Sequence, residues 1–194
     1  MKAMPFSKWK APLVLALPLG ARFQTRRMMR EGIPCRYRPG EVCYVGVPHW
    51  RKKEILRQPI IYDEWTALTR CEGRALDVLW RMGADTLRKE GFRRMAGRYL
   101  PGWAATQWVR TESNAPQRLQ DITEEDAEAE LVEARAWANG NIWKHYQRDC
   151  YSCPTATESY RTLIEAIHGP GTWGTNPWVW PIECEIVGRP EATQ

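Results

Sequence analysis

Apolar positions alternate with polar or small ones in three separate segments, and this period of two predicts strands. Residues 41–47 (EVCYVGV) are apolar on both alternating faces, which is typical of a strand buried on both sides. Residues 106–111 (TQWVRT) predict a shorter strand, and residues 178–187 (WVWPIECEIV) predict the last one. Pro181 inside that last segment indicates an edge strand or a bulge, because proline lacks the amide hydrogen that a sheet needs.

A period near 3.6 predicts helices in four other places. These are residues 12–20, residues 63–90, the acidic segment 121–130 and residues 158–167. In the acidic segment Thr123 is followed three residues later by Asp126, a pattern typical of a capping box at a helix start. Strands and helices therefore alternate irregularly along the chain, and we expect an α+β domain.

Residues 22–30 follow the first predicted helix and carry four arginines. Two interpretations are open for the stretch GARFQTRR at residues 20–27. In the structural interpretation, the arginines lie on a solvated connector or form ion pairs with the acidic helix at Glu124, Glu125 and Glu128. In the functional interpretation, they line the mouth of a site that binds an anion.

Length and charge restrict these possibilities only mildly. The chain has 194 residues, which suits a single domain spanning 1–194, and its net charge of +5 gives a weak preference for polyanions. Tryptophan is unusually frequent, at 11 residues, so some of these rings are candidates for stacking on flat ligands rather than for the core. We expect Trp178 and Trp180 to point into the core together, since they are two apart in a strand.

Six cysteines are present, but the rest of the composition does not resemble a small secreted scaffold, so we expect free thiols in a reducing compartment. Cys150 and Cys153 have the spacing of metal ligands, and His145 precedes them. A zinc site completed by Cys35 or Cys43 is an alternative to the prediction that the chain holds no metal and no cofactor.

The first twenty residues imitate a signal peptide, because lysines precede a short apolar stretch. Two prolines interrupt this stretch and arginines follow it at once, which is a poor flank for export. The sequence also has no apolar run of the roughly 20 residues that a membrane span requires. We therefore expect a soluble cytoplasmic protein with no membrane partner.

Four segments, taken in order, resemble one protein family. They are APLVLALPLGARFQTRR, RPGEVCYV, LQDITEEDAEAE and SYRTLIEAIHGPGTWGTNPWVWPIECEIV. They are similar to the ASCH domain, a PUA-like domain, in the version that bacteriophages and prophages carry. The resemblance implies a small PUA-like β-barrel of five to six mixed strands with helices packed outside, and insertions at about 55–98 and 140–154. It also implies that the protein is located in the cytoplasm of the host cell if the chain is phage-encoded.

The resemblance further implies that GARFQTRR lines a central cleft that receives RNA or another nucleic acid, including a modified or single-stranded base. Trp103 matches a loop near this cleft, where it either stacks on a base or packs under the loop. The expected ligand-binding residues are Arg22, Gln24, Thr25, Arg26, Arg27 and Trp103.

Some bacterial members similar to this family hydrolyse N4-acetylcytidine with a lysine, a threonine and a glutamate. The resemblance places Thr25 at the threonine nucleophile, Glu130 at the acid and Arg22 at the lysine. A guanidinium stays protonated and cannot act as the base that activates Thr25, so catalysis by this route is disfavoured.

Three functions therefore stay open at this stage. The first is a nucleic-acid or nucleotide-binding module, and the second is a hydrolase of the amidohydrolase or nuclease type. The third is a phage assembly or interaction protein, which an exposed tryptophan-rich surface in the insertions would suit.

Overall fold

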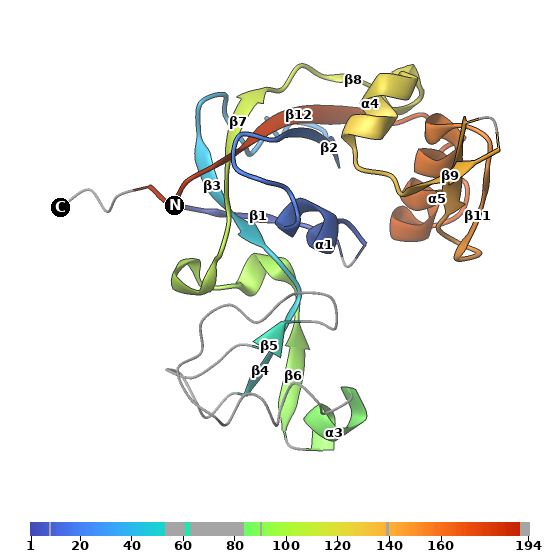
Figure 1. Cartoon of the computed structure of the whole chain (residues 1–194). Coiled ribbons are helices and arrows are strands. Elements are labelled where there is room, and N and C mark those ends of the chain that lie inside the picture. The colour runs from blue at the N-terminus through green and yellow to red at the C-terminus, as the bar shows by residue number, and fades with distance from the viewer. Residues whose placement is uncertain (8, 53–60, 63–83, 90, 139, 191–194) are drawn as a thin grey trace. The chain divides into compact units, whose positions relative to one another are not determined.

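The computed structural model describes residues 1–7, 9–52, 61–62, 84–89, 91–138 and 140–190 (Figure 1). These residues form two compact units. The first comprises Met1–Pro18, Val42–Val109 and the chain from Val187 on, and the second comprises Leu19–Glu41 and Arg110–Ile186. The described residues form both helices and strands, and the sheets contain parallel and antiparallel pairs of strands. This composition confirms the α+β class.

In the first unit, β3 (Val42–Gly46) lies between β1 (Ala3–Pro5) and β7 (Trp108–Ser113), whose first two residues belong to this unit. β1 and β3 are parallel, with Met4 opposite Val45. Both of these side chains are buried, as the alternating pattern of residues 41–47 predicts.

Helix α1 (Lys10–Leu15) is shorter than the predicted helix over residues 12–20. Pro18 accounts for the early end, because the residue before a proline is disfavoured in helical conformation. Val14 and Ala11 form the buried side of this helix.

The first unit also contains a three-stranded antiparallel sheet in the order β5 (Ile61–Tyr62), β4 (His49–Lys52) and β6 (Phe92–Met95). Helix α3 (Ala84–Lys89) precedes β6, and two single-turn 3-10 helices, η1 (Gly97–Tyr99) and η2 (Gly102–Ala104), follow it. Most of the long helix expected over residues 63–90 and of the insertion expected at about 55–98 lies outside the described residues.

Two glycines allow a close backbone approach in the first unit. A Cβ atom on Gly46 would lie 2.6 Å from the carbonyl oxygen of Gly97, and a Cβ atom on Gly97 would overlap the carbonyl oxygen of Gly46. The end of β3 and the start of η1 therefore pack backbone to backbone, which requires glycine on both sides.

In the second unit, β12 (Trp178–Val187) lies between β2 (Arg22–Met28) and the part of β7 from Arg110 on. β12 and β2 are antiparallel, and the short strand β8 (Gln117–Arg118) pairs with the first two residues of β12. The prediction of an edge strand from Pro181 is wrong, because β12 has neighbours on both sides. Pro181 lies beyond the part of β12 that pairs with β8, because this pairing ends at Val179.

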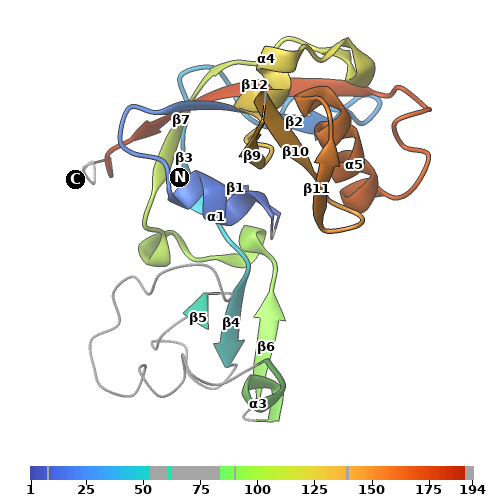
Figure 2. The same cartoon turned by 45° about the vertical axis from the view of Figure 1, so that its right-hand side comes forward.

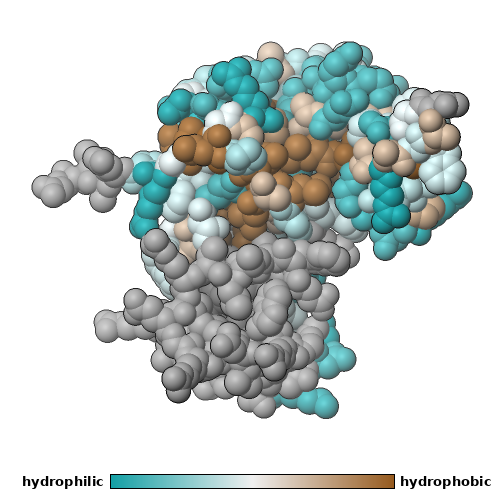
Figure 3. Space-filling view, viewed as in Figure 1, coloured by the Kyte–Doolittle hydropathy of each residue, from teal (hydrophilic) through white to brown (hydrophobic). Residues whose placement is uncertain are grey.

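Helix α4 (Glu124–Ala129) begins at Thr123 with the predicted capping box, in which the Asp126 amide donates to Thr123 Oγ1 over 3.1 Å. The single-turn helix η3 (Leu119–Asp121) precedes it. Exposed glutamates of α4 form part of a hydrophilic surface at the top of the view in Figure 3. Helix α5 (Ala156–His168) includes the predicted segment 158–167 and ends at Gly169.

A second three-stranded sheet in this unit follows the order β11 (Cys150–Cys153), β10 (Gly140–His145) and β9 (Ala134–Trp137). Both of its pairings are antiparallel, and α5 packs against β10 and β11 (Figure 1 and Figure 2). The insertion expected at about 140–154 thus contains β10 and β11.

The strands that the structure describes form open sheets, with no closed barrel among them. The coarse expectation of a small β-rich α+β fold is therefore met, and the PUA-like barrel remains a proposal.

Candidate functional site

The arginine-rich segment, for which a solvated connector is one of the open interpretations, forms strand β2. Successive side chains of a strand lie on opposite faces, so Gln24 and Arg26 lie on one face while Thr25 and Arg27 lie on the other. Charged residues are tolerated inside this strand because acidic groups from α4 neutralise one of its faces.

Arg26 is the centre of that neutralised face. Its side chain is only 1% exposed, and its Nη2 lies 2.8 Å from Asp126 Oδ2. Its Nη1 lies 3.7 Å from Glu130 Oε1, and with the Gln117 amide oriented to present its oxygen, Arg26 Nη2 donates to Gln117 over 2.8 Å. Gln24 Nε2 donates to Asp126 Oδ1 over 3.2 Å. The predicted ion pairing with the acidic helix is thus present, but through Asp126 and Glu130.

Tyr160 of α5 completes this buried network. The Arg26 Cζ atom lies 5.8 Å from the centre of the Tyr160 ring, and the tyrosine is almost fully buried. Burial raises the pKa of the Tyr160 hydroxyl well above its ordinary value, and the Glu130 carboxylate raises it further. Arg26 therefore connects β2, α4 and α5, and its guanidinium is committed to the interior.

The proposed catalytic residues are not brought together. Thr25 is buried on the face of β2 opposite Arg26, whereas Glu130 contacts Arg26. Arg22 lies on the Arg26 side of the strand, is largely exposed and forms an ion pair with Glu112 over 3.2 Å. For Thr25 and Glu130 to act as a catalytic pair, their side chains must lie within hydrogen-bond distance. They do not, because Glu130 contacts the Arg26 face of β2 and Thr25 lies on the other face.

The Thr25 face carries a different set of side chains. In the register of β2 with β12, Thr25 is opposite Ile182 and Arg27 is opposite Trp180. Side chains directly opposite one another in an antiparallel pair lie on the same face. Ile182 is fully buried, and Trp180 is half-buried.

The same face continues onto β8. Trp178 is opposite Arg118, and the Arg118 Cζ atom lies 4.5 Å from the centre of the Trp178 ring. Trp178 is 46% exposed. The expectation that Trp178 and Trp180 both point into the core is therefore wrong. They do share a face, but the core on that face ends at Ile182, and the start of the strand emerges toward solvent.

We call Arg27, Arg118, Trp178 and Trp180 the tryptophan face. Arg118 is held in position, since its Nη1 donates to the carbonyl of Asn176 over 3.2 Å. Exposed indole rings next to guanidinium groups can stack on planar ligands and bind anions. Arg118 was not among the predicted site residues, because only the pairing of β8 with β12 brings it beside Trp178.

The segment before β12 is fixed to the segment after β8. Asn176 Oδ1 accepts a hydrogen bond from the Gln120 amide over 2.9 Å, and the Trp173 carbonyl accepts one from Gln120 Nε2 over 2.7 Å. The backbone of Asn176 is left-handed (φ 42°), a conformation that asparagine adopts more readily than most residues. The loop that carries the start of β12 is thus ordered by its own polar contacts.

His168 ends α5 on the side of Arg27. Partial burial lowers the pKa of His168, and the positive charge of Arg27 lowers it further. The lowered pKa favours the neutral form of His168 at pH 7, so the cations of the tryptophan face are its two arginines.

Trp103, the remaining predicted ligand-binding residue, belongs to the first unit, in η2. It is 60% exposed, so it does not pack under its loop.

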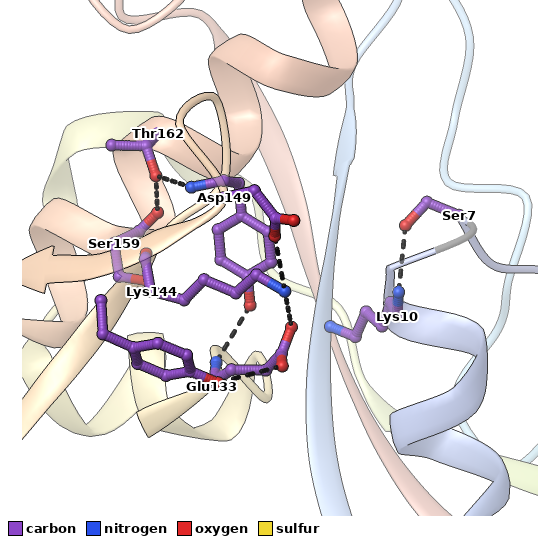
Figure 4. Close-up of polar contacts among 9 residues, drawn as sticks. Ser7, Lys10, Glu133, Lys144, Asp149, Ser159 and Thr162 are labelled. Carbon is purple, nitrogen blue, oxygen red and sulfur yellow. Dashed lines mark hydrogen bonds and ion pairs between the residues drawn. The ribbon is translucent and has the colours of Figure 1, made fainter. Parts of the chain in front are cut away.

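A second polar cluster lies around Lys144 of β10, in the hairpin that β10 forms with β11 (Figure 4). Lys144 Nζ lies 2.9 Å from Glu133 Oε1 and 3.3 Å from Asp149 Oδ1. Burial alone would lower the pKa of Lys144, but hydrogen bonds and charge from Glu133 and Asp149 outweigh it and raise the pKa. Ser159 Oγ donates to the Lys144 carbonyl over 2.5 Å, which ties β10 to α5. We interpret this cluster as structural.

The five cysteines in the described part of the chain form no disulfide bond with one another. Cys150 lies opposite His145 in the hairpin, with Cys150 exposed and Cys153 buried. Among the residues that the structure describes, no three His, Cys, Asp or Glu side chains are grouped closely enough to hold a metal ion. The alternative of a zinc site thus has no support from this part of the chain.

The helices in the described ranges are all too short or too polar to span a bilayer. Comparison of the chain with protein-family models, with curated proteins and with solved structures gives no match.

Proposed function

We propose that this protein binds nucleic acid or a nucleotide through the tryptophan face of its second unit. The observation that carries the proposal is the pairing of Arg118 with the exposed ring of Trp178, beside Arg27 opposite Trp180. Stacking on aromatic rings and contact with phosphates are the two interactions that proteins use to bind unpaired nucleotides.

The charges of this face favour a ligand that carries phosphate. Arg27 and Arg118 provide planar guanidinium groups, which match phosphate oxygens in geometry. The net charge of +5 adds a weak attraction for polyanions over a longer range.

We also propose that the fold is PUA-like and that the chain is related to the ASCH family. Two segments that carry the resemblance to the ASCH domain lie side by side: QTRR belongs to β2, and the last three residues of NPWVW begin the neighbouring strand β12, with Arg27 opposite Trp180. This arrangement supports a PUA-like domain whose ligand lies along β2 and β12. Cysteines that form no disulfide bond with one another in the described chain are consistent with a cytoplasmic site of action.

Titration of the intrinsic tryptophan fluorescence tests the proposal on the full chain. The probes are a short single-stranded RNA and the matching DNA, each at low salt and at fourfold higher salt. Two phosphate contacts on a single strand predict that the fourfold increase weakens binding about sevenfold. Affinity that does not change with salt, or no binding of either probe, would overturn the proposal.

Single-arginine variants locate the contact. We expect Arg27→Ala and Arg118→Ala each to weaken binding and to reduce the salt dependence by about one phosphate contact. Arg88→Ala is the matched control, because it removes the same charge from an exposed arginine that lies outside the tryptophan face and pairs with Asp85 in α3 of the first unit. Equal weakening by all three variants would indicate non-specific attraction in place of a site.

A further inference from the structure

We infer that the tryptophan face takes one internal, unpaired base of a single strand, with its flanking phosphates on Arg27 and Arg118. This inference rests on the proposed function and adds the class of nucleic acid to it. It follows from the relative positions of the four side chains on three neighbouring strands.

The first step concerns the two indoles. Trp178 and Trp180 are two residues apart on β12 and therefore on one face, with their Cα atoms about 7 Å apart along the strand. Bases in a strand stack at about 3.4 Å, so two indoles about 7 Å apart leave room for one flat ring between them. The stacking surface therefore suits one base, and not a long stack.

The second step concerns the arginines, which lie on opposite sides of the tryptophans. Arg118 is on β8 and opposite Trp178, whereas Arg27 is on β2 and opposite Trp180. β12 separates the two arginines, so their Cα atoms are about two strand spacings, or roughly 10 Å, apart across the sheet. Two cations placed in this way can bind negative charge on both sides of a base at the same time.

Only some ligands carry charge on both sides of an unpaired base. A mononucleotide has phosphate on one side of its sugar only, and it leaves one arginine without a partner. A base pair inside a duplex is stacked between its neighbours and cannot lie on an indole without being extruded. An internal nucleotide of a single strand has a phosphate on each side and an accessible base, and it satisfies all four side chains.

The third step concerns preorganisation. Arg118 is held over Trp178 by the Asn176 carbonyl, and Asn176 in turn is bonded to the Gln120 amide. Arg27 projects from a strand that is paired along its whole length with β12. Because these groups are ordered without ligand, little conformational entropy is lost when a nucleotide binds.

The test compares four probes on the full chain: a single-stranded trinucleotide, the same trinucleotide with an abasic central position, the mononucleotide and a blunt duplex containing the same sequence. Base stacking on an aromatic side chain changes affinity by roughly 5- to 150-fold. We expect the intact trinucleotide to bind at least about fivefold more tightly than each of the other three probes.

Variants separate the stacking contribution from charge. Trp178→Ala and Trp180→Ala are expected to remove the advantage of the intact trinucleotide over the abasic one, and Trp178→Phe to retain most of it. Trp137→Ala is the matched control, because Trp137 is an exposed tryptophan on β9 of the same unit and outside the tryptophan face.

The outcomes are distinguishable. Equal affinity for the mononucleotide and the trinucleotide, or for the duplex and the single strand, would overturn this inference and leave the proposed function intact. Retention of the base-dependent advantage in both tryptophan-to-alanine variants would also overturn it. Failure of all four probes to bind would overturn the proposed function itself.

Discussion

Arg26 Nη2 lies 2.8 Å from Asp126 Oδ2, and the arginine side chain in this pair is buried while the aspartate is partly exposed. The two residues are 100 positions apart in the chain. Their contact connects the basic strand β2 to the acidic helix α4 and explains why charged side chains are compatible with the interior of the second unit.

The first prediction concerns this ion pair. We expect Asp126→Ala to lower the free energy of unfolding by about 3 kcal/mol, because the guanidinium stays buried after it loses its shorter contact. Glu128→Ala is the control on the same helix, since Glu128 is exposed, and it should change stability by less than about 0.5 kcal/mol. Urea denaturation of both variants measures the difference. Similar values for the two would contradict a buried, energetically important pair.

The second prediction concerns the start of α5. Glu124 accepts hydrogen bonds from the Ala156 amide (2.8 Å) and the Thr157 amide (3.1 Å). Burial opposes ionisation of Glu124, but the hydrogen bonds from Thr157 and Ala156 outweigh it and lower the pKa. Because the pKa is lower in the folded state, the stabilisation is present above the ordinary pKa of a glutamate and is lost as pH falls through the lowered value.

Glu124→Gln should therefore cost about 0.5–1 kcal/mol at pH 7, and the difference from the wild type should disappear in acid. Glu125→Gln, on the neighbouring exposed residue, is the control and should change stability by less than about 0.5 kcal/mol at pH 7. The measurement is thermal unfolding followed by circular dichroism between about pH 3 and pH 7, a range that includes the ordinary pKa of a glutamate. A difference that persists unchanged in acid would exclude a charged cap.

The third prediction concerns alkaline pH. Tyr146 is buried, and its hydroxyl accepts a hydrogen bond from the Glu133 amide over 3.0 Å. Burial raises the pKa of Tyr146 above its ordinary value, so the folded state resists ionisation more than the unfolded state does. The stability that this shift provides is fully present below the ordinary tyrosine pKa of about 10 and is lost as pH rises above it.

Tyr146→Phe removes this titration. We expect the variant to be less stable than the wild type by about 1 kcal/mol at pH 7, through loss of the hydrogen bond, but to lose less stability above pH 10 or thereabouts. Urea titrations at neutral and alkaline pH measure both effects. Parallel loss of stability in the two proteins at alkaline pH would refute a role for Tyr146.

The fourth prediction concerns the two faces of β12. Val179 is fully buried, while its neighbour Trp178 is 46% exposed. Val179→Ala should lower the free energy of unfolding by about 2 kcal/mol, whereas Trp178→Ala should cost less than about 1 kcal/mol in spite of the larger side chain removed. Chemical denaturation compares them directly. The reverse order would mean that Trp178 belongs to the core after all.

The fifth prediction concerns the glycine contact of the first unit. Gly97→Ala places a methyl group against the backbone of Gly46, where nothing can move aside cheaply, and should cost about 1–3 kcal/mol or more. Gly102→Ala is the control, since the atoms nearest to its methyl group would be those of the Tyr44 ring, at 3.4 Å and beyond. Wild-type stability of Gly97→Ala would contradict the close approach.

Local signals in the sequence predicted much of the secondary structure. The capping box at Thr123, the helix that ends at Gly169 and the strands around Val45 and Ile182 are each specified by neighbouring residues. The sequence does not identify the arginine segment as a strand, because the countercharges at Asp126 and Glu130 that make it compatible with the interior are distant in sequence. No local pattern carries that information.

The candidate site was predicted only in part for the same reason. The sequence groups Thr25, Arg26 and Arg27 in one candidate site, but alternation along β2 places Arg26 on the other face. Trp178 and Trp180 were correctly expected to share a face, but whether that face is buried depends on what covers it. Arg118 joins the face through strand pairing, which residue spacing does not reveal.

The Asp126 carboxylate accepts hydrogen bonds from both elements: from the amide of Thr123 at the start of α4, and from Gln24 and the guanidinium of Arg26 on β2. A helix of six residues is too short to persist in water by itself. The acid that starts the helix is thus also the acid that fastens the strand, and neither element is expected to acquire lasting protection from hydrogen exchange before the other. A chain truncated before residue 121 would leave the guanidinium of Arg26 without its acidic partners, so β2 should become ordered only late in synthesis, when α4 has emerged.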